Sequence, residues 1–86
     1  MTESVSIDAR IRAVLAQHGR LAQDAGALAE STDLYQAGLT SHASVNVMLA
    51  LESAFDVEFP DQMLTRSAFS SIAAIRGALT QLIVAA

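Results

Sequence analysis

The chain has 86 residues, enough for one small domain, and contains no cysteine, which excludes a disulfide framework and thiolate metal sites. Its five basic residues are all arginines and face nine acidic residues, so the formal net charge at pH 7 is −4. This balance argues against a nucleic-acid-binding surface, which needs a basic patch, and favours a basic protein as partner.

No apolar run approaches the roughly 20 residues that a membrane span needs. The first residues, Met1 to Ser4, lack the basic start and the apolar run of a secretory signal peptide. We therefore expect a cytoplasmic monomer without membrane contact, built as a single domain over residues 1–86.

The first helix is expected to begin at Ser6, a possible N-cap, and to stop at Gly19. Its apolar stripe at helical spacing consists of Ile7, Ile11, Val14, Leu15 and His18. The segment from Arg20 to Ala37 is then expected to be a long loop with at most a helical turn. Leu28 and Leu34 should hold it against the core. Loops of this length inside a small domain are often functional.

The central helix is expected from about Ser41 to Phe55, because Gly38 interrupts regular structure and both Thr40 and Ser41 suit an N-cap. Two stripes follow at helical spacing: Val47, Leu51, Ala54 and Phe55 form one, and His42, Val45 and Leu49 form the other. The first stripe should face the core. The second is either a surface for a partner or a half-buried face against the long loop.

The segment from Asp56 to Asp61 should end the central helix, because Pro60 disfavours helical structure at the residue before it. A short helix is expected over residues 61–64 and a last helix around Ile72, Ile75, Leu79, Leu82 and Ile83. Strand alternation is absent from the pattern. The sequence therefore predicts an all-α fold: a small bundle of three main helices and one short helix.

Catalysis is not expected. Ser41 and His42 are a possible nucleophile and base, but adjacent residues on a helix do not face each other. The histidines and acids lack metal-ligand spacing, and the glycines do not form a phosphate loop. Composition and spacing alone indicate a small acidic helical interaction domain in which Ser41 is a helix cap.

The run Gly38-Leu39-Thr40-Ser41 resembles the phosphopantetheine attachment motif of acyl carrier and peptidyl carrier proteins. The resemblance extends over residues 7–83 at the spacing of that family. The further matching positions are Leu34, Leu51-Glu52, Phe55, Phe59-Pro60-Asp61, Thr65, Phe69 and Ile72. Two positions depart from the pattern, since Thr40 stands where the family usually has aspartate and His42 where it usually has leucine.

The resemblance implies an acyl-carrier-protein-like four-helix bundle. It also implies that Ser41 receives 4′-phosphopantetheine from a phosphopantetheinyl transferase. Such a protein is a carrier that holds cargo as a thioester on the thiol of the arm, not an enzyme. A phosphate attached at this position suits the N-terminus of a helix, where free amides and the dipole favour negative charge.

The run from Leu39 to Val45 is similar to stand-alone carriers charged with an amino acid. Their amino acid:carrier protein ligases resemble truncated class II seryl-tRNA synthetases. The cargo expected is a small amino acid such as glycine or alanine. The residues expected to bind the partner are Thr40, His42, Val45, Leu49 and Glu52.

Two alternatives stay open. One is a specialised acyl carrier protein for lipid or polyketide synthesis, served by acyl-transfer enzymes. The other is a helical interaction domain that carries no arm.

Overall fold

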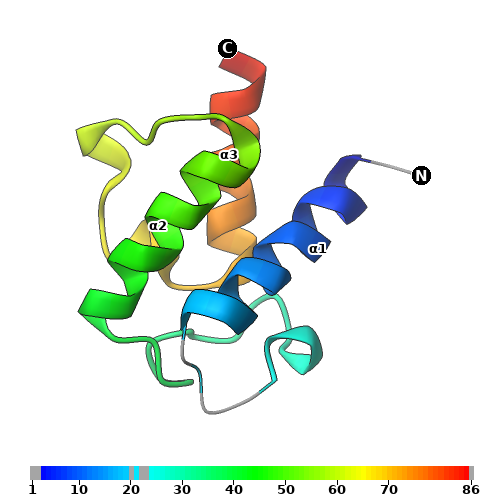
Figure 1. The fold of residues 1–86 in the computed structure, drawn as a ribbon, viewed down its shortest axis with the longest axis vertical. Helices are drawn as coiled ribbons and strands as arrows, with labels where there is room; N and C mark the ends of the chain where they lie inside the picture. Colours follow the sequence, from blue (N-terminus) through cyan, green and yellow to red (C-terminus); the bar gives the residue numbers. More distant parts are fainter. Residues whose placement is uncertain (1–2, 20, 22–23, 86) are drawn as a thin grey trace.

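The computed structural model describes residues 3–19, 21 and 24–85 and consists of helices and loops (Figure 1). Within these residues there is no strand, and the all-α fold expected from the sequence is confirmed. No helix of this part is long and apolar enough to cross a membrane. The elements are α1 (Glu3–Val14), the π-helical turn η1 (Leu15–Gly19), the 3₁₀ turn η2 (Ala25–Ala27), α2 (Ser41–Phe55), the 3₁₀ turns η3 (Asp61–Met63) and η4 (Ser67–Phe69), and α3 (Ile72–Ala85).

The three helices enclose one apolar core. α1 contacts both α2 and α3, and the segment over residues 24–40, called the long loop below, lies at one end of the bundle (Figure 1). Branched aliphatic side chains fill the centre because their bulk packs well between helices. The largest of the fully buried side chains are Ile11, Leu15, Leu34, Leu51, Ile72, Ile75, Leu79 and Val47.

The first helix differs from the prediction at its start and in the form of its last turn. α1 is already helical at Glu3, so the proposed start at Ser6 is wrong. No glycine or proline separates Glu3 from Ser6, and a serine that can cap a helix does not oblige the helix to begin there. At the other end, helical structure does stop at Gly19, but the last turn is π-helical. This wider turn leaves His18 exposed, although it continued the apolar spacing.

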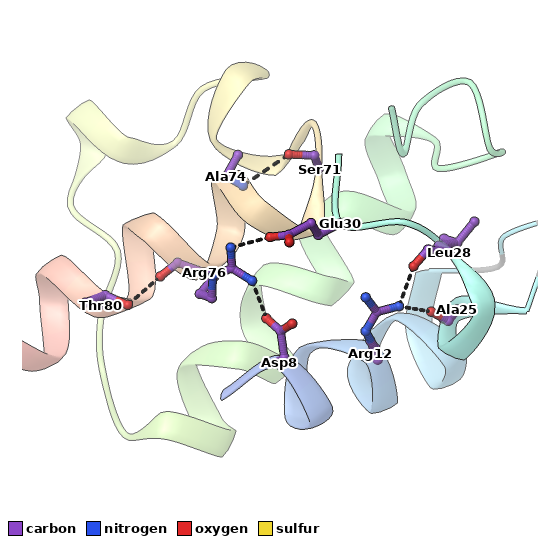
Figure 2. A network of polar contacts seen from close by, with 9 residues as sticks. All are labelled: Asp8, Arg12, Ala25, Leu28, Glu30, Ser71, Ala74, Arg76 and Thr80. Atoms are coloured by element: carbon purple, nitrogen blue, oxygen red, sulfur yellow. Dashed lines mark hydrogen bonds and ion pairs between the residues drawn. The ribbon is translucent and has the colours of Figure 1, made fainter. Parts of the chain in front are cut away.

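The long loop is held in place as expected by Leu28 and Leu34, which are both buried. Arg12 of α1 adds polar contacts that the sequence did not indicate: its Nη1 donates to the carbonyl oxygens of Ala25 at 3.0 Å and Leu28 at 2.6 Å (Figure 2). Backbone groups of a loop need such partners when side chains cover them. The loop therefore has a defined course along α1.

Arg76 of α3 joins three parts of the chain. Its guanidinium donates to Asp8 of α1 at 2.8 Å and to Glu30 of the long loop, as Figure 2 shows. The hydrogen bonds to Glu30 and then to Asp8 raise the pKa of Arg76 above its ordinary value. Two backbone hydrogen bonds also join the long loop to this region: the amide of Leu34 donates to the carbonyl of Ser70, and the amide of Ala73 donates to the carbonyl of Glu30. The loop is therefore fixed to the start of α3 as well as to α1.

The two stripes of α2 lie on different faces, as the sequence predicted. Val47 and Leu51 are fully buried, whereas Val45 is 51% exposed and Leu49 is 53% exposed. The alternative in which the second stripe packs against the long loop is therefore wrong. Phe55, expected in the core stripe, is only half-buried, and the guanidinium of Arg10 lies 4.5 Å from its ring centroid.

We expect Leu51→Ala to lower the free energy of unfolding by about 2–5 kcal/mol, because it leaves a cavity in the core. The matched control is Leu49→Ala on the same helix, which should change stability by less than about 0.5 kcal/mol because Leu49 already contacts water. Urea unfolding followed by circular dichroism measures both values. Similar losses in the two variants would contradict the assignment of faces.

Candidate functional site

The chain enters α2 through a turn that depends on glycine. Gly38 has a φ of 119°, in the region that favours glycine. The amide of Leu39 donates to the carbonyl of Leu34 at 2.9 Å, and the Leu39 side chain is buried. This turn places Thr40 in extended conformation directly before the first helical residue.

Thr40 is the N-cap of α2. Its Oγ1 accepts a hydrogen bond from the amide of Ala43 at 3.0 Å. Both Thr40 and Ser41 suited this position in the sequence, and the structure assigns it to Thr40, so the interpretation of Ser41 as the cap is wrong. Threonine at this position retains the oxygen acceptor that an aspartate would also offer, but carries no charge.

Ser41 is the first residue of α2 and is exposed to solvent. Its carbonyl accepts a bond from the hydroxyl of Ser44 at 2.7 Å, while its own hydroxyl is not needed for the cap. The first amides of a helix lack partners within the helix, so this end is favourable to an attached anion. Ser41 therefore lies exposed to solvent beside backbone amides that can bind a phosphate.

A groove of about 390 Å³ opens beside Ser41, between the first turns of α2 and the segment that contains η3 and η4. Most of its surface is apolar, and one lining side chain is charged. The lining residues are Tyr35, Ser41, Ser44, Val45, Met48, Leu64, Thr65, Arg66 and Phe69.

Tyr35 and Arg66 hold each other at the edge of this groove. The guanidinium of Arg66 lies 3.9 Å from the centroid of the Tyr35 ring, and the Tyr35 hydroxyl donates to the Arg66 carbonyl at 3.1 Å. Burial raises the pKa of Tyr35, the positive charge of Arg66 opposes this effect, and Asp33 adds to it. The sequence carried no signal for this pair, because its members lie 31 positions apart.

The residues predicted to bind a partner do not all have the same surroundings. His42, Val45 and Leu49 are exposed on α2. Glu52 is half-buried, and its Oε2 accepts a bond from the amide of Phe59 at 2.8 Å. Glu52 thus ties the chain after α2 to the helix, while its role toward a partner stays a prediction. In the described part of the chain no cluster of histidine, aspartate and glutamate could hold a metal ion.

Comparison with known proteins identifies the family. A family model described as the phosphopantetheine attachment site matches residues 9–79. The aminoacyl carrier protein of Agrobacterium fabrum is 51% identical over 69 residues, which cover 80% of this chain and 83% of that relative. The chain belongs to the aminoacyl carrier proteins. The resemblance seen in the sequence is confirmed, and with it the phosphopantetheine-dependent carrier function.

Two solved structures are similar in sequence and in fold. The carrier protein from Agrobacterium tumefaciens was crystallised with an engineered Bradyrhizobium japonicum glycine:[carrier protein] ligase and AMP. It is 48% identical, with a TM-score of 0.83, and the match covers 85% of this chain and 97% of that chain. A glycylated carrier protein in complex with the Bradyrhizobium japonicum ligase is 27% identical, with a TM-score of 0.74 and coverage of 85% and 97%.

The site fits a phosphopantetheine group on chemical grounds. An exposed hydroxyl stands at the start of a helix, an arginine lines the adjoining groove, and carboxylates are absent from the groove lining. These features would accept a phosphodiester without burying an unpaired charge.

The structure predicts effects of different size on stability for two neighbouring hydroxyls. Thr40→Ala should lower the free energy of unfolding by about 0.5–2 kcal/mol, because the cap on the Ala43 amide is lost. Ser41→Ala should change it by less than about 0.5 kcal/mol, since the variant removes an exposed group outside the cap. Thermal unfolding of the unmodified variants measures both effects. A larger loss for Ser41→Ala than for Thr40→Ala would contradict the assignment of the cap.

Proposed function

We propose that this protein carries a small amino acid as a thioester on a 4′-phosphopantetheine arm attached to Ser41. The observation that carries the proposal is the position of the Ser41 hydroxyl, exposed at the first residue of α2 while Thr40 makes the cap. Because Thr40 makes the cap, the Ser41 hydroxyl is available for modification.

Attachment would replace the hydrogen of the Ser41 hydroxyl by a phosphorus–oxygen bond. A transferase would cleave coenzyme A at its pyrophosphate, Ser41 Oγ would take the phosphopantetheinyl half, adenosine bisphosphate would leave and the hydroxyl proton would be released. The first amides of α2 would stabilise the added negative charge. When attached, the arm supplies the thiol that this cysteine-free chain lacks.

A small amino acid is the cargo that the related complexes support. The relatives were crystallised with a glycine:[carrier protein] ligase, and one of them carries glycine. A long acyl chain would instead need burial, which stabilises it by about 0.8 kcal/mol per methylene. The groove beside Ser41 is lined in part by Val45 and Leu64, which are both exposed, so it would leave such a chain partly in water. This favours glycine or alanine over a lipid or polyketide intermediate.

The exposed face of α2 is the proposed binding surface for the ligase. His42, Val45 and Leu49 follow Ser41 along this face, and Val45 and Leu49 offer apolar contact area. Activation of the amino acid with ATP and its transfer would be carried out by the ligase. The carrier itself would contribute no catalytic group to either step. The cytoplasmic location expected from the sequence stays a prediction.

Ser41→Ala should abolish modification. Incubated with coenzyme A, magnesium and a phosphopantetheinyl transferase, the wild type should gain one phosphopantetheinyl group by intact mass and the variant none. The matched control is Ser44→Ala, which lies one turn along the same helix and should be modified like the wild type. Modification of Ser41→Ala, or its loss in Ser44→Ala alone, would place the attachment elsewhere. Thr40 in place of the usual aspartate makes it necessary to try more than one transferase.

The arm-bearing protein should accept labelled glycine or alanine from an amino acid:carrier protein ligase and ATP, and accept malonyl groups poorly from a malonyl transferase. Val45→Asp and Leu49→Asp should slow aminoacylation at least several-fold, because a charge would be desolvated at the interface. Ile83→Asp changes an exposed apolar residue near the end of α3 and should leave the rate unchanged. Efficient malonyl loading without an aminoacyl thioester would favour the lipid or polyketide alternative.

A further inference from the structure

We propose that Arg66, held on the ring of Tyr35, binds the phosphodiester that joins the arm to Ser41. The inference rests on the proposed function, because it requires the arm at Ser41. It assigns to Arg66 a positioning role in the modified protein. The residues that carry it are Tyr35, Ser41 and Arg66, which line one groove.

The other arginines with described side chains are committed to the fold. Arg10 donates to the carbonyl of Ala54, Arg12 donates to carbonyls of the long loop, and Arg76 pairs with two carboxylates. Arg66 differs from them because, among the described residues, its guanidinium makes neither a hydrogen bond nor an ion pair and lies over the Tyr35 ring. Its positive charge is therefore not neutralised by a neighbour in this part of the chain.

The groove provides an electrostatic reason for an anion at this place. Arg66 is the single charged residue among the nine that line it. Ser41 and Arg66 are both exposed to solvent in this groove, so a contact between the arginine and an attached phosphate would be open to screening by salt. In a chain of net charge −4, this is a local positive site in the same groove as the exposed Ser41.

Tyr35 orients Arg66 in a way that leaves the guanidinium able to bind. The guanidinium carbon of Arg66 lies over the ring, 3.9 Å from its centroid, and the guanidinium N–H groups can donate to phosphate oxygens. The bond from the Tyr35 hydroxyl to the Arg66 carbonyl also fixes the backbone at the start of η4. A cation held in this way loses less conformational freedom on binding an anion.

The test compares unmodified and modified forms of three proteins: wild type, Arg66→Gln and Arg10→Gln. Arg10 is the matched control, because it also lies over an aromatic ring, that of Phe55, but at the opposite end of α2. Intact mass first establishes that each protein carries the group. Phosphorus NMR of the modified proteins then follows the phosphodiester resonance from about 0.01 M to about 1 M salt, a range over which the Debye length falls from about 30 Å to about 3 Å.

We expect a salt-dependent phosphorus resonance in the wild type and in Arg10→Gln, and its loss in Arg66→Gln. The modified forms of the wild type and Arg10→Gln should also gain more in melting temperature over their unmodified forms than Arg66→Gln does. Arg66→Lys, which keeps the charge, should retain part of the salt dependence. A purely structural contact between Arg66 and Tyr35 would change the melting temperatures of both forms equally and would not move the phosphorus resonance.

The outcomes separate this inference from the function on which it rests. If the wild type gains no phosphopantetheinyl group, the proposed function fails and this inference with it. If wild type and Arg66→Gln are both modified and show the same phosphorus resonance at every salt concentration, this inference alone is overturned. The same holds if Arg10→Gln loses the salt dependence together with Arg66→Gln.

Discussion

The hydrogen bond from the Ala43 amide to the Thr40 hydroxyl defines where α2 begins, and the geometry of the site depends on that start. Each residue of an α-helix advances the chain by about 100° around the helix axis. A helix that began one residue later would therefore change the direction of every following side chain relative to the preceding loop. With the observed start, Ser41 stands at the helix tip and Leu51 points into the core. The same start leaves Val45 and Leu49 exposed to solvent.

The turn before this cap is itself held by the remainder of the molecule. Leu34 and Leu39 are buried on either side of Gly38, and the Leu39 amide bonds to the Leu34 carbonyl. The long loop that carries these residues has further buried apolar side chains, and two arginines add polar contacts to it: Arg12 from α1 and Arg76 from α3 (Figure 2). The position of the site therefore depends on contacts between all three helices and the loop.

The distribution of charge follows from this use of the arginines. A chain with nine acids and five bases directs at least three of its bases toward its own carbonyl and carboxylate groups. In the groove beside Ser41, Arg66 is the one charged residue of the lining. Carriers that rely on an acidic central helix would meet a partner by charge attraction. Here Glu52, the one acid of α2, is engaged with the Phe59 amide, and apolar contact area dominates the exposed face.

Much of the fold and of the site was determined by the sequence alone. The bounds of α2 from Ser41 to Phe55, the two faces of that helix and the anchors Leu28 and Leu34 follow from apolar spacing and from local breakers, because burial of a helix face imposes a period of 3.6 residues. The carrier family was indicated separately, by the resemblance of the run from Gly38 to Ser41 and of the positions after it to the attachment motif of carrier proteins.

Other features were decided only by the tertiary structure. The choice of Thr40 over Ser41 as the cap depends on the backbone angle that Gly38 and the buried Leu39 impose. The start of α1 before Ser6 and the π-helical turn at Leu15–Gly19 were likewise not indicated by the apolar spacing or by the possible caps. The pairing of Tyr35 with Arg66 joins two loops that no periodic pattern connects, and contacts of this kind come into being only when the helices between them have packed.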